Sequence, residues 1–399
     1  MEGLLEKISE ELQIDKSKWI PTKFGDVAIQ QKGKVDRDNT DLKRYVQGGH
    51  MNSEDLHLRS WGELKDEYLG PAFIRRFDEG DILYGSRRTY LRKVVIAPFS
   101  GITSNTTFVI RANEKNIDKR LLPFIMMSEG FTDNSVRNSK GSVNPYINWK
   151  DIAKYEFLLP PKDQQAQLAI LLWAMDEVIE REKEVLEKLV VAYTSTIEKK
   201  IIDKNSNKIY FKNLGKLIRG VGFKPKDLLD EYSENAFVLL RSNNISDSKV
   251  NYGKVYFLPL ELLKNDQQLI PGDFALCMSN GSKNLVGKAA KFNGYNKRVS
   301  IGSFCAGFRP KDTLSGEIIN HLFASESYRQ AIKRILSGSA INNLKPSDIE
   351  DLYLRLNFEG SNFKSTLKSL NSMVTGKIQL ESKIASSQSL QKSLINQIF

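Results

Sequence analysis

Arginine, lysine, asparagine and tyrosine side chains gather in the loops that follow short β-type segments, and these residue types bind duplex DNA. Arg and Lys pair with phosphates, and Arg and Asn also hydrogen-bond base edges in the major groove. One group flanks the Gly-Asp segment at residues 80–88, and another falls between Lys283 and Arg298, a window without an acidic residue. We predict a DNA-contact set made of Arg75, Arg87, Arg88, Tyr90, Arg92, Lys140, Asn144, Arg219, Lys224, Arg241, Asn243, Asn280, Lys283, Lys288, Asn342 and Asn343.

Each of these residues has an ordinary alternative role. A single Lys or Arg is more often a solvated surface charge than a ligand contact. Asparagine favours turns because its side chain hydrogen-bonds nearby backbone. DNA binding is favoured because such loops recur at matching places in both halves of the chain. Asn144 is expected to match Asn342-Asn343.

The chain carries the same pattern twice. A Gly-Asp-hydrophobic segment occurs at residues 80–88 and again at 272–280. A Gly-Ser loop leading into an acidic-apolar strand occurs at 141–152 and 338–349, and an apparent first strand at 24–27 and 214–217. The three pairs keep their order, so we predict two similar modules. A duplication on a basic chain suggests a ligand with two-fold character, and duplex DNA is the obvious candidate.

Composition narrows the class of protein. The 399 residues, 40% of them hydrophobic, suffice for two ordinary cores, and 59 basic against 48 acidic residues give a net charge of +11. No apolar run approaches the ~20 residues of a transmembrane helix, and the N-terminus does not resemble a signal peptide. Cys277 and Cys305 are predicted to be buried reduced thiols. We therefore expect a cytoplasmic protein with no membrane association.

Catalytic and metal-binding patterns are missing from the sequence. Two Cys and three His lie too far apart for a zinc site or a nucleophile–base pair. There is no Walker-type phosphate loop. Asn144-Pro145-Tyr146 lacks the second proline of the Asn-Pro-Pro-aromatic motif of amino-methyltransferases, and an ordinary turn is the better interpretation. We predict no catalytic residues, no metal and no cofactor on this chain.

Two long helices are predicted from the hydrophobic period. Residues 164–202 contain neither Gly nor Pro, and apolar residues recur at spacings of three and four. A second such stripe runs from Phe363 to Ile398, so the two are expected to form an antiparallel coiled coil. Gly376 leaves a break in the second helix open. Leu4, Leu5, Ile8 and Leu12 indicate a short N-terminal helix.

The predicted fold is α+β, with two similar globular modules joined by the two long helices in a pseudo-two-fold repeat. Each module is expected to hold one curved, mostly antiparallel sheet, with brief helices at 119–128 and 317–336. The expected segments are an N-terminal helix at 1–18, modules at 19–160 and 205–358, and helices at 161–204 and 359–399.

At the junction between the first module and its helix, the chain resembles the DNA-specificity subunits of type I restriction–modification enzymes. The residues that carry the resemblance are Leu158-Leu159-Pro160-Pro161-Lys162-Asp163-Gln164-Gln165 and Asp176-Glu177-Val178-Ile179-Glu180, with the Gly-Asp-Ile-Leu strand and its Arg-Arg loop. The resemblance covers nearly the whole chain. It implies that each module is a target recognition domain for one half of a split DNA site, and that the helices set the gap.

The resemblance also implies partners. Two methyltransferase subunits and further restriction subunits would join the chain on double-stranded DNA, and S-adenosylmethionine, ATP and Mg would belong to those partners. The second module departs from the pattern, since residues 356–361 lack the Pro-Pro-x-x-x-Gln junction. This departure concerns how the partners dock and leaves the DNA prediction untouched.

Two other classes of protein remain as alternatives. A stand-alone duplicated DNA-binding protein would more often carry a helix-turn-helix signal. A coiled-coil scaffold would explain the helices but not the paired basic loops. Co-purification with a methyltransferase would discriminate among the three.

Overall fold

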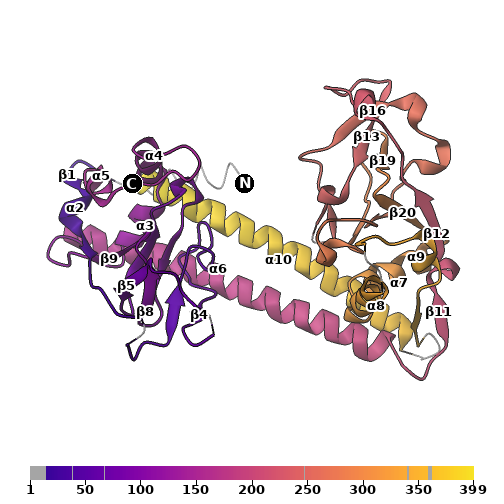
Figure 1. The fold of residues 1–399 in the computed structure, drawn as a ribbon, viewed down its shortest axis with the longest axis horizontal. Helices are drawn as coiled ribbons and strands as arrows, with labels where there is room; N and C mark the ends of the chain where they lie inside the picture. The colour runs from indigo at the N-terminus through magenta and orange to yellow at the C-terminus, as the bar shows by residue number, and fades with distance from the viewer. Residues whose placement is uncertain (1–14, 38, 67, 247, 339–340, 358–361) are drawn as a thin grey trace. The chain divides into compact units, whose positions relative to one another are not determined.

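The computed structural model describes the chain except for residues 1–14, 38, 67, 247, 339–340 and 358–361. The chain divides into two compact units. Unit 1 comprises Met1–Lys183 and Ser382–Phe399, and unit 2 comprises Glu184–Glu381. Each unit contains a globular part and segments of both long helices (Figure 1). The predicted N-terminal helix with Leu4 and Ile8 lies outside the described residues.

Unit 1 holds two four-stranded sheets and one two-stranded sheet, with strand orders β2-β9-β6-β7, β4-β3-β8-β5 and β1-β10. All pairings are antiparallel except β3 with β8. The strands are β1 (Ile20–Lys23), β2 (Ala28–Gln31), β3 (Arg44–Val46), β4 (Gly62–Glu63), β5 (Phe73–Phe77), β6 (Ile82–Gly85), β7 (Val94–Ile96), β8 (Gly101–Ser104), β9 (Thr107–Ala112) and β10 (Glu156–Leu159).

Unit 2 repeats this arrangement. Its sheets have the orders β12-β20-β17-β18, β16-β13-β19, β11-β21 and β14-β15, and β13 with β19 is again a parallel pair. The strands are β11 (Lys208–Tyr210), β12 (Gly215–Arg219), β13 (Ala236–Leu240), β14 (Ile245–Ser246), β15 (Lys249–Val250), β16 (Tyr256–Pro259), β17 (Phe274–Cys277), β18 (Ala289–Lys291), β19 (Val299–Ile301), β20 (Cys305–Pro310) and β21 (Tyr353–Arg355). The predicted duplication is therefore present in the topology.

The central strand of each unit explains why the Gly-Asp segments are apolar. In β6, Ile82 and Tyr84 contribute to one hydrophobic core and Leu83 to another. In β17, Phe274 and Leu276 likewise face one core, whereas Ala275 and Cys277 face another. Successive strand residues point to opposite sheet faces. A sheet covered on both sides thus produces the continuous apolar run in the sequence.

Two long helices, α6 (Lys162–Thr196) and α10 (Phe363–Ile398), contribute to both units, and α6 ends in a π-helical turn, Ile197–Ile201. In unit 1, Gln391 contacts Leu172 and Ser387 contacts Glu182, so these segments run antiparallel. α10 is continuous through Gly376, where an added Cβ would meet Leu189 at 3.6 Å. The helix therefore has no break at this glycine.

The remaining helices are short. Unit 1 has α2 (Phe24–Val27), α3 (Leu122–Met127), α4 (Glu129–Arg137), α5 (Trp149–Ile152) and the 3₁₀ turn η1 (Thr89–Leu91). Unit 2 has α7 (Thr313–Phe323), α8 (Glu326–Ser337) and α9 (Pro346–Glu350), with 3₁₀ turns η3 (Phe211–Asn213), η4 (Pro225–Asp227), η5 (Ser242–Asn244), η6 (Leu260–Leu262), η7 (Asn265–Gln267) and η8 (Lys283–Leu285).

Several local predictions were wrong. The first strand predicted at 24–27 is the helical turn α2, where Gly25 lies so close to Ala153 that a Cβ would sit 3.1 Å from it. The acidic-apolar strands after the Gly-Ser loops are the helices α5 and α9. The single helix predicted at 317–336 is two, because Ser325 caps α8 by accepting from Tyr328 N. Each unit also has two main sheets rather than one.

Candidate nucleic-acid interface

The Gly-Asp turns are structural in both units. Gly80 and Gly272 have φ of 85° and 99°, a region that favours glycine. Asp81 is buried and accepts from the side chain of Arg111, and Asp273 is buried and accepts from that of Arg309. The acidic residue of this repeat therefore fixes the start of the central strand and does not face a ligand.

The residues after β6 meet the Gly-Ser loop in unit 1. Ile147 N donates to Ser86 O at 2.9 Å and Arg88 N donates to Pro145 O at 2.7 Å, with Arg87 opposite Tyr146. We name residues 86–92 and 139–147 the first loop pair. This backbone ladder carries a group of exposed polar side chains on neighbouring turns: Arg87, Arg88, Tyr90, Lys140 and Asn144.

Side-chain contacts order part of the first loop pair. The Arg88 Nε donates to Asn144 Oδ1 at 2.9 Å. Lys140 Nζ lies 4.0 Å from Asp151 Oδ2, at the limit of an ion pair. Among the described residues, no carboxylate forms an ion pair with Arg87 or Arg88. The charges of these two guanidinium groups are therefore not neutralised within the protein.

Unit 2 has a second loop pair, residues 278–285 and 341–344, built by the same ladder. Leu344 N donates to Met278 O at 2.8 Å and Asn280 N to Asn342 O at 3.4 Å, with Ser279 opposite Asn343. The Asn342 amide donates to Gly281 O, and the Asn280 amide donates to Ser242 Oγ. Exposed Asn243 lies next to Ser242 in η5, and Lys283 is exposed in η8.

The ladders correct the predicted equivalence of the asparagines. Arg88 corresponds to Asn280, and Pro145 corresponds to Asn342. One residue earlier, Asn144 matches Ile341, not Asn342-Asn343 as the sequence pattern suggested. The backbone is thus repeated, whereas the side chains differ: arginines in the first loop pair stand where Ser279 and Asn280 stand in the second.

Other predicted contact residues lie elsewhere or are already engaged. Arg75 is within β5, not in a loop, and donates to Lys32 O. Arg92 pairs with Glu54, and the Arg241 guanidinium packs over the Tyr256 ring at 3.5 Å.

Three more predicted residues lie outside the second loop pair. Lys288 is half-buried, and its carbonyl accepts from Cys277 N. Arg219 is exposed at the end of β12. Lys224 is exposed before η4, and its backbone N donates to Asp227.

Exposed apolar side chains belong to both loop pairs, and none of them is in the DNA-contact set predicted from the sequence. Val143 and Tyr146 are 83% and 43% exposed in the first, and Ile341 is 70% exposed in the second. Phe304, 69% exposed, adjoins the second because its carbonyl accepts from Met278 N and Ser279 N. Their position inside loops rich in Gly, Ser and Asn was the sequence signal that could have identified them as exposed.

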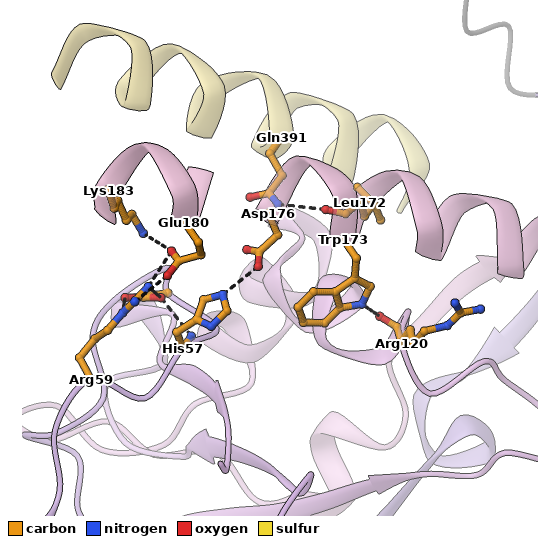
Figure 2. Close-up of polar contacts among 10 residues, drawn as sticks. His57, Arg59, Arg120, Leu172, Trp173, Asp176, Glu180, Lys183 and Gln391 are labelled. Carbon is orange, nitrogen blue, oxygen red and sulfur yellow. Dashed lines mark hydrogen bonds and ion pairs between the residues drawn. The ribbon is translucent and has the colours of Figure 1, made fainter. Parts of the chain in front are cut away.

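The loop at residues 55–59 docks the globular part of unit 1 on α6 (Figure 2). His57 Nε2 lies 2.8 Å from Asp176 Oδ2, and this hydrogen bond raises the pKa of His57, against the effect of burial. Arg59 donates to Glu180 at 2.7 Å.

Two further contacts of unit 1 appear in the same view. Trp173 Nε1 donates to Arg120 O at 3.0 Å, and Gln391 Nε2 donates to Leu172 O at 3.3 Å (Figure 2). The first contact, like those of the 55–59 loop, ties the globular part of unit 1 to α6, and the second ties α10 to α6.

No alternative chemistry emerges from the described residues. Within them, no three His, Cys, Asp or Glu side chains come together as a metal site would require. Cys277 and Cys305 are buried free thiols, and burial raises the pKa of Cys305 to about 12. None of the described helices has the length and apolar character needed to cross a membrane.

Comparisons with known proteins agree on one family. Residues 8–190 match the family described as "Type I restriction modification DNA specificity domain". The StySPI specificity subunit of Salmonella potsdam is 35% identical over 138 residues, which cover 34% of this chain and 29% of that protein. The MjaVIII specificity subunit of Methanocaldococcus jannaschii is 23% identical over 340 residues, 75% of this chain and 76% of the relative.

The fold has solved relatives of the same kind. The type I restriction–modification S subunit from M. genitalium matches with a TM-score of 0.56 at 12% identity, covering 98% of each chain. A chain from a study of complex assembly and conformational transition of the type I R-M system matches with a TM-score of 0.50 at 16% identity, covering 95% of this chain and 96% of that one. Residues 8–190 therefore match the specificity domain of type I restriction–modification systems, and the chain shares the fold of solved S subunits, while the matched segment spans about 29% of the StySPI relative.

Proposed function

We propose that this protein is the DNA-specificity subunit of a type I restriction–modification enzyme, and that each loop pair reads one half of a split DNA site. The two loop pairs share one backbone ladder but differ in side chains at equivalent positions. That combination suits a reader of two different half-sites, because a fixed scaffold positions the loops and variable side chains choose the bases.

The observation that carries the proposal is the ladder itself. Ser86 with Ile147 and Met278 with Leu344 occupy equivalent places after the two Gly-Asp strands. On a chain of net charge +11, exposed Arg87, Arg88 and Lys283 supply phosphate-binding charge, and exposed amides supply hydrogen bonds to bases.

The chain acts without catalysis of its own in this proposal. Two methyltransferase subunits bind it, restriction subunits join the full complex, and S-adenosylmethionine, ATP and Mg are held by those partners. The segments of α6 and α10 present the docking surface for the methyltransferases.

A stand-alone DNA-binding protein or a coiled-coil scaffold outside restriction–modification is the competing function. The match of residues 8–190 to the specificity domain disfavours both, and a binding experiment separates them. The full chain, expressed with the methyltransferase of its own operon, is incubated with a pool of randomised duplexes and labelled methyl donor. We expect a selected split sequence that is methylated only when both proteins are present.

The matched control is the chain alone with the same duplexes and donor, for which we expect no incorporation. Methyl transfer by the chain alone would refute the non-catalytic role. Failure to co-purify with the methyltransferase, combined with sequence-specific binding by the chain alone, would favour the stand-alone protein.

A further inference from the structure

Three residues of unit 1 adopt a backbone conformation that ordinary side chains rarely occupy, and all three belong to one contact network. Glu54, Arg88 and Arg92 have φ values of 53°, 51° and 48°. Left-handed conformations of this kind are strained for residues with a Cβ, and they persist only where the surroundings hold them. Arg88 and Arg92 bracket η1 in the first loop pair.

Glu54 holds Arg92 through both backbone and side chain. Its backbone N donates to Arg92 O at 3.1 Å, and Arg92 Nη1 donates to Glu54 Oε1 at 3.0 Å. Arg92 N in turn donates to Thr89 O, and Leu91 N donates to Arg88 O. A single 3₁₀ turn therefore separates the contact with Glu54 from Arg88, the residue that bonds Asn144.

The same carboxylate is also held by the C-terminal helix. Lys392 Nζ of α10 donates to Glu54 Oε1 at 2.8 Å. Burial opposes ionisation of Glu54, but the hydrogen bond and charge of Lys392, with those of Arg92, lower its pKa. At neutral pH one ionised carboxylate is thus shared by the first loop pair and α10.

The Glu54 and Lys392 side chains are 44% and 43% exposed, so the restraint on this contact comes from Arg92 and its other neighbours. The Arg92 side chain is 16% exposed, and its other arm lies 3.9 Å from Glu129, whose backbone N donates to Asn396 Oδ1 of α10. Glu54 and Lys392 line a hollow of about 350 Å³ in unit 1. The neighbouring residues His57 and Arg59 bind α6.

We propose that Glu54 is a positioning residue that transmits the placement of α10 to the first loop pair through Arg92, so that reading of one half-site depends on this tie. The inference rests on the proposed function and assigns Glu54 no contact with DNA. Unit 2 has no such arrangement among its described residues, where Ser248 is the one non-glycine with positive φ and lies outside the second loop pair. The effect is therefore confined to one half-site.

The test uses the full chain, alone and with its methyltransferase, and the variants Glu54→Gln and Lys392→Met. Hydrogen exchange of the free chain reports residues 86–92 directly. Selection from a pool of randomised duplexes reports the base preference at each half-site. The matched control is Glu156→Gln, which removes an exposed carboxylate of β10 paired with Lys23 of β1, outside both loop pairs and both long helices.

We expect Glu54→Gln to accelerate exchange in residues 86–92 and to lower base discrimination at one half-site by about tenfold, the discrimination that one base-reading side chain provides. Base preference at the other half-site stays unchanged. The control variant keeps wild-type exchange and wild-type preference at both half-sites. Lys392→Met shows the same pattern in weaker form, and the double variant adds little to Glu54→Gln because both act on one contact.

Three results would overturn the inference. Unchanged exchange in residues 86–92 would mean that Glu54 does not hold the loop. Faster exchange with unchanged discrimination, or an equal loss at both half-sites, would mean that the tie is merely structural. If wild type selects no sequence, the proposed function fails, and the exchange arm still decides whether Glu54 restrains the loop.

Discussion

Arg309 holds the buried carboxylate of Asp273 with two hydrogen bonds, from Nε to Oδ1 at 2.9 Å and from Nη2 to Oδ2 at 2.7 Å. Asp273 Oδ2 also accepts from Ile270 N, which closes the turn before β17. Arg111 and Asp81 form the same paired contact before β6 in unit 1. Each central strand is thus anchored by an ion pair between neighbouring strands of its sheet.

Removing one partner of this pair should destabilise unit 2. Asp273→Ala leaves the Arg309 guanidinium, itself only 22% exposed, without its carboxylate, and a loss of this kind costs about 3 kcal/mol. Denaturant unfolding measures the change. Asp351→Ala, which breaks the exposed pair with Lys212, is the control and should cost far less, because water solvates and screens both charges. Equal effects of the two substitutions would contradict the structural role.

The two histidines that contact α6 should give opposite pH dependences. Asp176 raises the pKa of His57 above its ordinary 6.5, so its contribution to stability is complete below pH 6.5 and is lost as pH rises through the folded-state pKa. Burial lowers the pKa of His321, which bonds Tyr193 and Asn371. Its contribution is present above pH 6.5 and is lost as pH falls below that value.

Hydrogen exchange between pH 5.5 and 8, corrected for intrinsic exchange rates, measures the effect of His57 in unit 1 and that of His321 in unit 2 separately. We expect local protection near residues 55–59 to fall toward the alkaline end, and protection of α7 to fall toward the acid end. His57→Gln should flatten the first trend and leave the second intact. A parallel trend in both segments would show that neither histidine controls it.

The charges of the first loop pair should govern its salt dependence. Arg87→Ala with Arg88→Ala lowers the slope of log affinity against log salt by about one for each phosphate that is no longer neutralised. If these residues read guanine instead, discrimination falls by roughly 1–3 kcal/mol at one position. Lys283→Ala with Lys288→Ala tests unit 2. Because Lys288 is half-buried, Lys283 should carry most of that effect.

Lys115→Ala with Lys119→Ala removes the same formal charge from exposed positions outside the loop pairs and serves as the control. Binding curves of Arg87→Ala with Arg88→Ala that match this control at every salt concentration would place the interface elsewhere.

Lengthening both helices together should lengthen the gap between half-sites. About four residues, near one helical turn, inserted after Lys188 add roughly 6 Å to α6. Because Leu189 approaches Gly376, a matching insertion after Lys377 keeps the two helices in register. At ~3.4 Å per base pair, we expect a gap one or two base pairs longer with both half-site sequences unchanged. Methylome sequencing measures the gap, and an active variant with the original gap would show that the helices do not set the spacing.

Gly376 offers a stabilising substitution. It lies inside α10, and an added Cβ would make ordinary contact with Leu189 at 3.6 Å. Gly376→Ala should therefore raise the free energy of unfolding by up to about 1 kcal/mol, the difference in helix propensity. Thermal unfolding of both proteins tests this. A lower stability would indicate that α10 needs the smaller residue for its packing against α6.

The sequence alone determined the duplication, the two long helices and the central strands, because each is written in local periodicity. A covered central strand needs apolar residues on both faces, and a helix packed along one side needs them every three or four positions. The Gly-Asp turn was visible for the same reason, since only glycine readily takes φ near 90° and the following carboxylate is buried.

Only the tertiary structure decided which charged residues gather on one surface. Arg88 and Arg92 are four residues apart, yet one bonds Asn144 beside a solvent-exposed loop and the other binds Glu54. Partners 38 and 56 residues distant leave no periodic trace, because loop closure depends on how the whole sheet packs. The register that matches Asn144 with Ile341 likewise follows from backbone hydrogen bonds within each loop pair. Residue types alone do not reveal which backbone groups pair.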